Sequence, residues 1–124
     1  MASRIYDASA FYAGIPFASP EQGLTTSLVF DEIKHIKKNH GAIEILLDTD
    51  RLRIEDPNSA STEFVSNMAK KTGDSQELSD ADISAVALAH QLGASLVTDD
   101  FAVSNLAKNL KIPVQSVMTK GIKD

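Results

Sequence analysis

Residues 79–101 read SDADISAVALAHQLGASLVTDDF, and this stretch decides the fold class. Its first part predicts a helix from Ser79 to about Leu92, because a serine cap opens it, apolar residues fill it and a glycine follows it. The next part, Ala94–Thr98, has the short apolar run of a buried strand. A helix that leads into a buried strand is the repeating unit of an α/β domain with a parallel sheet.

The same alternation of short apolar runs and amphipathic stretches continues along the rest of the chain. The expected strands are Arg4–Asp7, Leu52–Glu55, Ala94–Thr98 and Ile112–Val117. The expected helices are Ala8–Tyr12, one that Thr25 or Thr26 caps and that runs to about Asn39, one from Ser61 or Thr62 through Lys71, Ser79–Leu92 and Phe101–Asn109. Ala42–Leu47 fits a helix or a strand. We expect one domain over residues 1–124, with a frayed tail at Lys120–Asp124.

The composition narrows the class of protein. The 124 residues are 43% hydrophobic and 23% charged, which is ordinary for a globular protein that can bury a core. Cysteine is absent, which excludes disulfides, thiolate catalysis and Cys-ligated metal in this chain and fits a reducing cytoplasm. No apolar run reaches the roughly 18 residues of a membrane span, so we expect no membrane partner. The net charge of −5 argues against nucleic-acid binding through a basic surface alone.

Acidic residues stand at junctions between the expected strands and helices. Asp7 ends the first strand, and Asp99 and Asp100 directly follow a later one. The carboxyl ends of parallel strands meet at one edge of a sheet, so we expect these side chains to project to the same rim. Each also has a structural alternative, because aspartate often caps a turn or a helix. If Thr98 or Asp99 caps the following helix, Asp100 stays free to reach the site.

Glu32 is expected on a helix with an apolar inward side. Leu28, Glu32 and Ile36 fall at i, i+4 and i+8, which places Glu32 on or beside the core-facing stripe. A carboxylate there needs a partner, because burying an unpaired charge is costly. A salt bridge with Lys34 or Arg4 would supply one. A divalent metal held jointly with the other acids would also do so, and we favour the metal.

Asp82 lies in the first turn of the helix that Ser79 opens. The two residues have the spacing of a capping box, so a purely structural role for Asp82 stays open. Asp82 shares a helix face with Val86 and Ala89 and is therefore directed inward, whereas Asp80 is directed outward. We prefer Asp82 as the functional acid, while Asp80 suits the positive end of the helix dipole.

These acids together form a candidate metal site. Its members are Asp7, Glu32, Asp82 and Asp100, with Asp99 as an alternative ligand. Carboxylates repel one another when brought together without a cation, and their oxygen atoms suit Mg²⁺ or Mn²⁺. Such a cluster fits metal-assisted hydrolysis of a phosphodiester. The candidate contacts to RNA phosphates are Lys34, Lys37, Lys38, Lys70 and Lys71, for which a solvated surface role is the simpler alternative.

The four acids are placed as in the PIN-domain ribonucleases (the PilT N-terminus family), which the chain resembles over essentially its whole length. The family has an Asp after the first strand, a Glu in a helix after a Thr-initiated segment, an Asp opening a later helix and an Asp after the next strand. Here these positions are Asp7, Glu32, Asp82 and Asp100. The resemblance implies a three-layer α/β/α fold of the PIN and FEN-nuclease type, one or two Mg²⁺ or Mn²⁺ ions at these acids, and endonucleolytic cleavage of RNA.

Three further segments are more specific. They are Ala69-Lys70-Lys71-Thr72-Gly73-Asp74, Leu78–Ile83, and Thr98-Asp99-Asp100-Phe101-Ala102 with Asn105. They resemble the Nob branch of the family, whose members are endonucleases of small-subunit ribosomal RNA 3′-end maturation in archaea and eukaryotes. This resemblance implies pre-ribosomal RNA or a pre-ribosomal subunit as the partner. PIN domains often pair, which implies a homodimer as well.

One departure from the Nob branch concerns zinc. That branch carries a Cys-ligated zinc ribbon after its PIN domain, and this chain has no cysteine. We therefore expect either a ribbonless archaeal relative or a truncated chain. Two alternatives stay open: a toxin-type PIN ribonuclease controlled by an antitoxin, and a catalytically weak PIN domain that binds RNA as a scaffold. A phosphorelay receiver is set aside, because Asp7 is followed by Ala8 and not by a second acid.

Overall fold

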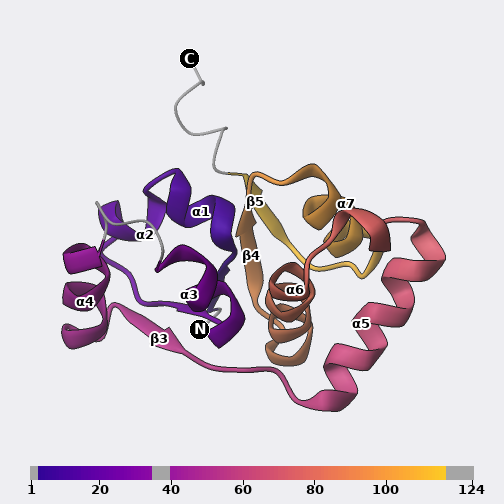
Figure 1. The fold of residues 1–124 in the computed structure, drawn as a ribbon, viewed down its shortest axis with the longest axis horizontal. Coiled ribbons are helices and arrows are strands. Elements are labelled where there is room, and N and C mark those ends of the chain that lie inside the picture. The colour runs from indigo at the N-terminus through magenta and orange to yellow at the C-terminus, as the bar shows by residue number, and fades with distance from the viewer. Residues whose placement is uncertain (1–2, 35–39, 117–124) are drawn as a thin grey trace.

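A parallel β-sheet flanked by helices forms the centre of the protein (Figure 1). The computed structural model describes residues 3–34 and 40–116. The strands are β1 (Arg4–Tyr6), β2 (Gly23–Thr25), β3 (Leu52–Ile54), β4 (Ser95–Thr98) and β5 (Val114–Ser116). The helices are α1 (Ala8–Tyr12), α2 (Ile15–Ala18), α3 (Ser27–Ile33), α4 (His40–Asp48), α5 (Ser59–Thr72), α6 (Asp80–Leu92) and α7 (Phe101–Asn109), with a 3₁₀ turn η2 (Ser75–Glu77). The α/β class with a parallel central sheet is confirmed.

The direction in which the chain adds strands reverses at β1. The strand order is β3-β2-β1-β4-β5, so the chain first moves outward to β3 and then returns past β1 to β4 and β5. In Figure 1, α1 to α4 lie to the left of β4 and α5 to α7 to its right. The helices of the two directions are not fully separated by the sheet, because α3 packs against α6. Sheets of this kind bind ligands beyond the strand ends at such a reversal, which here lies between β1 and β4.

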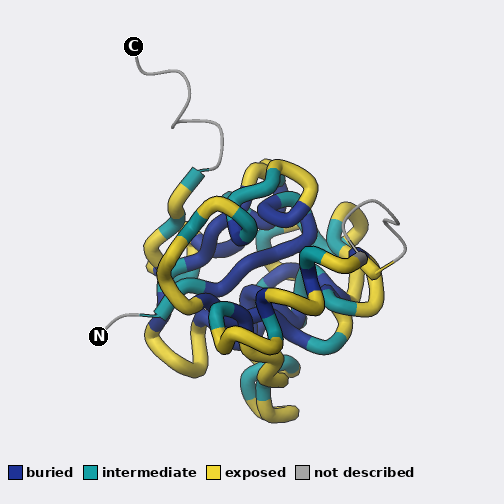
Figure 2. Tube along the Cα trace, turned by 90° about the vertical axis from the view of Figure 1, so that its left-hand side faces the viewer, coloured by how far each residue is buried: buried dark blue, intermediate teal, exposed yellow. Residues whose placement is uncertain are grey.

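The buried residues lie at the centre of the molecule (Figure 2), and they include the two central strands. Ile5 of β1 pairs with Leu96 of β4, and both side chains are completely buried. Helix α6 packs against β1 and β4 with an unbroken buried run, 84–89, whose small alanine side chains allow close approach. Within the described part of the chain, no helix combines the length and apolar character needed to cross a membrane.

Capping and glycine residues in the sequence predicted several helix ends correctly. Ser79 caps α6, and Gly73 and Gly93 end α5 and α6 in the left-handed conformation, with φ of 85° and 65°. Glycine adopts this conformation without steric cost, which is why both positions stop a helix. The ambiguous segment Ala42–Leu47 belongs to the helix α4, whose buried residues Ile43 and Leu46 have helical spacing.

The strand β2 is absent from the sequence-based expectation. Its residues, Gly23-Leu24-Thr25, contain one large apolar side chain and therefore carry no strand pattern. Pairing with both β1 and β3 makes the segment a strand. The absence of a side chain at Gly23 is required, because a Cβ atom there would overlap the ring of Tyr6.

Other boundaries also differ from the expectation. Helix α3 ends at Ile33, and the expected continuation over residues 35–39 lies outside the described residues. Helix α5 begins at Ser59 because Asn58 caps it by accepting from the backbone N–H of Ser61 at 2.8 Å. The last strand begins at Val114, while its expected end at residue 117 and the expected tail 120–124 also lie outside the described residues.

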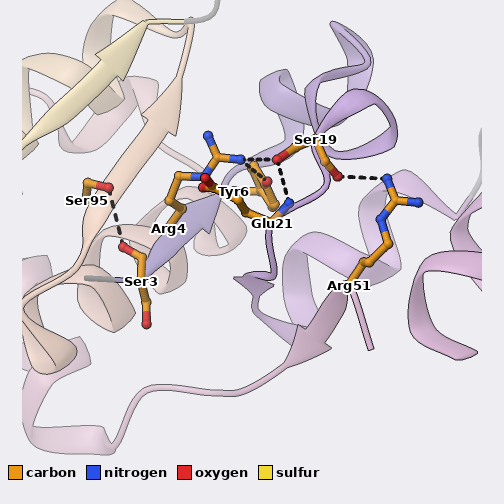
Figure 3. A network of polar contacts seen from close by, with 7 residues as sticks. All are labelled: Ser3, Arg4, Tyr6, Ser19, Glu21, Arg51 and Ser95. Atoms are coloured by element: carbon orange, nitrogen blue, oxygen red, sulfur yellow. Dashed lines mark hydrogen bonds and ion pairs between the residues drawn. The ribbon is translucent and has the colours of Figure 1, made fainter. Parts of the chain in front are cut away.

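A polar network fixes the amino end of β1 (Figure 3). Arg4 Nη2 donates to the hydroxyl oxygens of Tyr6 and Ser19, at 2.8 and 2.6 Å. Arg51 Nη2 donates to the carbonyl oxygen of Ser19 at 2.7 Å. The one ion pair of Arg4 within the described residues is with Glu21 at 4.0 Å, so the suggested salt bridge from Arg4 to Glu32 is wrong. The network ties the α2–β2 loop to the edge of the sheet opposite Asp7.

Candidate metal centre

Asp7 lies at the carboxyl end of β1, beside the end of β4. Its side chain is only 1% exposed. The hydroxyl groups of Thr98 and Ser9 donate to its two carboxylate oxygens, the latter to Oδ1 at 2.7 Å. The backbone N–H of Ala10 also donates to Oδ1, at 3.0 Å, so Asp7 caps α1. Three donors therefore hold this carboxylate in one orientation.

Burial makes the charged form of Asp7 unfavourable. It raises the pKa of Asp7 above its ordinary value of 3.8, while the hydrogen bonds from Thr98, Ser9 and Ala10 lower it in part. The negative charge of Asp82 raises this pKa further. Within the described residues, Asp7 forms no ion pair with a cationic side chain.

Asp82 forms the capping box that its spacing predicts. Ser79 Oγ accepts from the backbone N–H of Asp82 at 3.1 Å, and Asp82 Oδ2 accepts from the N–H of Ser79 at 3.0 Å. Burial raises the pKa of Asp82, and the charge of Asp100 raises it as well, whereas the hydrogen bonds with Ser79 lower it. Asp82 is thus both a helix cap and an electrostatic neighbour of the other aspartates.

Asp100 caps α7, which corrects the expectation that Thr98 or Asp99 would do so. Asp100 Oδ1 accepts from the N–H of Val103 at 3.0 Å. The hydroxyl of Thr98 is engaged instead with Asp7 and accepts from the N–H of Asp100 at 3.0 Å. Asp99 is exposed, and its N–H donates to Ser9 Oγ at 2.8 Å. Ser9 and Thr98 each form hydrogen bonds with Asp7 and with the segment 99–100. These bonds hold the start of α1 close to the start of α7.

Asp7, Asp82 and Asp100 therefore all lie at the start of a helix. Asp7 and Asp100 accept from backbone N–H groups in the first turns of α1 and α7, whereas Asp82 lies in the first turn of α6 and accepts from the N–H of the cap residue Ser79. The partial positive charge of a helix start favours an anion at all three positions. Asp82 Oδ1 and Asp100 Oδ2 have no hydrogen-bond partner in the described part of the chain. Capping takes one oxygen of each of these two carboxylates and leaves the other available. A capping role consequently does not exclude a role in binding a cation.

Glu32 does not lie on the core-facing stripe, which corrects a second expectation. Val29 and Ile33 form the buried side of α3, whereas Glu32 is exposed and Leu28 is 46% exposed. The reason is the helical period, which rotates the stripe of Leu28 and Glu32 away from that of Val29 and Ile33. The hydroxyl of Tyr12 donates to Glu32 Oε2 at 3.4 Å. Within the described residues, Glu32 belongs to no group of three acids close enough to hold a metal ion jointly.

The chemistry of the donor set fits a hard divalent cation. Across residues 3–34 and 40–116, no three His, Asp or Glu side chains are close enough to hold a metal ion jointly. However, the charge of Asp82 raises the pKa of Asp7, that of Asp100 raises the pKa of Asp82, and no cation among the described residues compensates them. Their oxygen donors are those that Mg²⁺ and Mn²⁺ prefer, and such ions complete their shells with water. Asp7, Asp82 and Asp100 therefore have the donor chemistry for such an ion, although in the described arrangement the three carboxylates do not surround one point.

The candidate RNA-contact lysines have separate positions. Lys34 follows α3 and pairs with Asp31 at 3.3 Å, so the suggested salt bridge from Lys34 to Glu32 is wrong. Lys70 and Lys71 are exposed in the last turn of α5. The other two, at positions 37 and 38, lie outside the described residues.

A hydrogen bond connects two of the three segments that resemble the Nob branch. Asn105 of α7 belongs to the segment that begins at Thr98. Its side-chain Nδ2 donates to Asp74 Oδ2 at 2.9 Å, and Thr72 Oγ1 donates to the same oxygen at 2.7 Å. The end of α5 that carries Lys70 and Lys71 is thereby tied to α7, the helix that Asp100 caps.

Sequence reasoning missed Thr98 as the partner of Asp7. The register pairs Tyr6 with Val97, which makes Asp7 and Thr98 neighbours at the strand ends. A threonine at the end of a central strand was visible in the sequence. Which carboxylate it would meet depends on the strand order, which short strands do not reveal.

Comparisons with known proteins identify the family of the chain. The profile of a family described as PIN domain of ribonuclease matches residues 5–92. The chain is 33% identical over 119 residues to the protein named endoribonuclease Nob1 of Pyrococcus abyssi, an alignment that covers 96% of this chain and 70% of that protein. It is 38% identical over 118 residues to the Nob1 endoribonuclease of Methanocaldococcus jannaschii, covering 94% of this chain and 57% of that protein.

Two further similarities extend the comparison. Ribonuclease VapC3 of Aeropyrum pernix is 29% identical over 122 residues, covering 94% of this chain and 87% of that protein. A solved PilT N-terminus domain protein from Sulfolobus solfataricus superposes with a TM-score of 0.58 at 20% identity, covering 92% of this chain and 86% of that chain. The second likeness concerns the fold alone.

Proposed function

The chain belongs to the PIN-domain family of ribonucleases, and we propose that it is a metal-dependent endoribonuclease that hydrolyses RNA phosphodiesters. The observation that carries the proposal is the hydrogen bonding of Thr98 to both the carboxylate of Asp7 and the N–H of Asp100, with Asp82 near enough to raise the pKa of Asp7. None of the three carboxylates has an ion-pair partner among the described residues. Clustered charges of one sign at the reversal point of a parallel sheet are unfavourable unless a ligand of opposite charge binds there.

The aspartates have different parts in this proposal. Asp7 is the fixed ligand, since three hydrogen bonds hold its carboxylate. Asp82 and Asp100 each present a carboxylate oxygen that their helix caps do not use, and exposed Asp99 is an alternative ligand. Glu32 would act from α3 through water. One or two Mg²⁺ or Mn²⁺ ions held by these residues would supply Lewis acidity and lower the pKa of a bound water.

The substrate that we propose is ribosomal RNA, at the 3′ end of the small-subunit RNA precursor. The support is the similarity, at 33% and 38% identity, to proteins named endoribonuclease Nob1. The candidate phosphate contacts are Lys34, Lys37, Lys38, Lys70 and Lys71. For Lys70 and Lys71, the tie between Asp74 and Asn105 supports a position beside the helix that Asp100 caps.

The test is cleavage of a labelled RNA that spans the 3′ end of the small-subunit precursor, with a scrambled RNA of the same composition as control. We expect cutting at one position with Mn²⁺ or Mg²⁺, none with EDTA, and little cutting of the scrambled RNA. Asp82→Asn should lose activity, while Asp80→Asn, an exposed residue in the same helical turn, should keep it. Equal cutting by wild type and Asp82→Asn would show that Asp82 is a helix cap only.

A second candidate is a toxin-type PIN ribonuclease with another RNA target, which an antitoxin controls. The similarity to the ribonuclease VapC3 of Aeropyrum pernix supports it. Metal-dependent cutting of other RNAs in preference to the ribosomal precursor would favour this candidate. RNA binding that EDTA does not change, without cutting under any metal, would instead favour a PIN domain that acts as a scaffold.

A further inference from the structure

Phe101 is 82% exposed, more than any other large hydrophobic side chain that the structure describes as exposed. It begins α7, immediately after Asp100. The buried side of α7 consists of Ala102, Val103, Leu106 and Ala107. A phenylalanine left in water forgoes the free energy that burial of its ring would release. The exposed ring directly beside the candidate metal centre is therefore a favourable contact surface for a ligand that covers it.

A depression of about 300 Å³ lies against this ring. Helix α7 lines it with Phe101, Ser104 and Lys108, which fall at i, i+3 and i+7 and so share one helix face. The end of β5 lines it from the other side. Asp99 and Asp100 also line it, so the depression is continuous with the candidate metal centre.

The two ends of this depression differ in charge. Asp99 and Asp100 make the end beside Phe101 acidic, whereas Lys108 makes the other end basic. Lys108 is exposed and forms no ion pair with any residue in the described ranges. Seven residues of helix separate Phe101 from Lys108 by about 10 Å along the axis. A neutral, flat group suits the first end, and an anion suits the second.

We propose that Phe101 is the stacking platform for one base of single-stranded RNA next to the cleaved bond, and that Lys108 binds a phosphate of the same strand. The proposal rests on the proposed function, because the RNA that it positions is the substrate of the aspartate site beside Phe101. Bases of every kind have a face that stacks on an aromatic ring, and a lysine at the other end of the groove attracts the backbone. The subsite thus positions the substrate without participating in the chemistry.

A second copy of the chain is the competing occupant of this surface. A stable dimer interface buries roughly 800 Å² on each partner and has an apolar centre. Here the ring of Phe101 stands between two carboxylates and a lysine, in a groove of about 300 Å³. The size and the charges therefore favour a nucleotide over a protein surface.

The experiment measures RNA binding in the Asp7→Asn background, where cleavage is not expected. A fluorescent single-stranded RNA is used intact and with one abasic nucleotide moved along the sequence. We expect Phe101→Leu to weaken binding of the intact RNA by about 5- to 100-fold, and Phe101→Tyr to retain it, as base–aromatic stacking predicts. At one position, the abasic RNA should bind equally weakly to the protein that retains Phe101 and to the Phe101→Leu variant, because the stacked base is already missing.

Two lysine variants complete the test. Lys108→Gln should weaken binding and lower the salt dependence by about one unit of slope. Lys111→Gln removes the same charge one turn further on, outside the depression, and should have the smaller effect. An abasic scan without a Phe101-dependent position, or equal effects of the two lysine variants, would overturn the subsite. A Phe101→Leu effect on mass by light scattering, and not on RNA binding, would assign the surface to a second copy and also overturn it.

The outcome is separable from that of the proposed function. Cleavage by the wild-type protein with Mn²⁺ together with a flat abasic scan leaves the endoribonuclease proposal intact and removes the subsite. If instead one abasic position depends on Phe101 but no metal-dependent cleavage occurs, the subsite stands and the endoribonuclease proposal fails. Thermal unfolding of each variant checks folding, which an exposed position such as Phe101 should not disturb.

Discussion

The hydroxyl group of Thr98 donates a hydrogen bond to the carboxylate of Asp7 and joins the ends of the two central strands. The same hydroxyl accepts from the backbone N–H of Asp100. One threonine thus links two of the three clustered aspartates. A carboxylate that is already oriented loses less entropy when a metal ion binds to it.

Removal of this hydroxyl should weaken both the fold and the metal site. Thr98→Val keeps the shape of the side chain but leaves the Asp7 carboxylate and the Asp100 N–H each without a partner. We expect a loss of about 1–3 kcal/mol in unfolding free energy and a roughly 10- to 100-fold weaker affinity for Mn²⁺. Denaturant unfolding and calorimetric titration with Mn²⁺ measure the two effects.

The matched control for this variant is Thr49→Val. Thr49 is exposed, and its hydroxyl bonds the backbone carbonyl oxygen of Ile45 at 2.7 Å within α4. It should leave Mn²⁺ affinity unchanged. If both threonine variants bind Mn²⁺ as the wild type does, Thr98 does not orient a metal ligand.

The raised pKa of Asp7 predicts that its neutral replacement stabilises the metal-free protein at neutral pH. The folded-state pKa lies above the ordinary 3.8, so the contribution of Asp7 to stability is full below 3.8 and is lost as the pH rises through the raised pKa. Asparagine does not titrate. In EDTA, Asp7→Asn should melt above the wild type at pH 7, and the difference should shrink toward pH 4.

Binding of metal should reverse this order of melting temperatures, so that the wild type melts above Asp7→Asn. Binding to the folded state stabilises it, so Mn²⁺ should raise the melting temperature of the wild type and leave that of Asp7→Asn nearly unchanged. Asp7→Asn should also abolish cleavage. A melting difference that is constant between pH 4 and pH 7 would contradict the burial of a charged Asp7.

The capping box of α6 allows the charge of Asp82 to be removed without loss of the cap. In Asp82→Asn the amide oxygen can still accept from the Ser79 N–H, so we expect a change in unfolding free energy within about 0.5 kcal/mol. Mn²⁺ affinity should nevertheless fall by about tenfold or more, since a ligand charge is lost. Asp80→Asn, which removes a charge from the same turn, should retain the wild-type affinity.

Gly23 and Gly41 offer a matched pair for testing the packing around β2. A Cβ atom at Gly23 would overlap the ring of buried Tyr6, whereas one at Gly41 in α4 would meet no atom within 4 Å. Gly23→Ala should destabilise the protein by about 1–3 kcal/mol through overpacking. Gly41→Ala should stabilise it by about 0.5–1 kcal/mol, because alanine favours the helix. Chemical denaturation of both variants tests the pair, and a Gly23→Ala protein of wild-type stability would contradict the contact with Tyr6.

Elements with strong local patterns were predictable, and those that depend on packing were not. The helix α6 carries its own cap and stop, at Ser79 and Gly93, so its bounds follow from the sequence. The strand β2 has no such pattern and exists because its neighbours pair with it. Glu32 shows the same limit, since adjacent stripes of α3 both contain apolar residues and only contact with other helices decides which stripe is buried.

The sequence by itself determined the alternation of strands and helices, the positions of the caps, and the presence of acids at the strand ends. These follow from backbone preferences and hydrogen bonds within a few residues. Only the tertiary structure decided that Asp7 meets Thr98, 91 residues away. It also decided that Asp82 lies near enough to Asp7, and Asp100 near enough to Asp82, to raise their pKa values, and that Glu32 is exposed and bonded to Tyr12. Strand register and charge coupling depend on distances through space, and a linear pattern of residue types does not contain those distances.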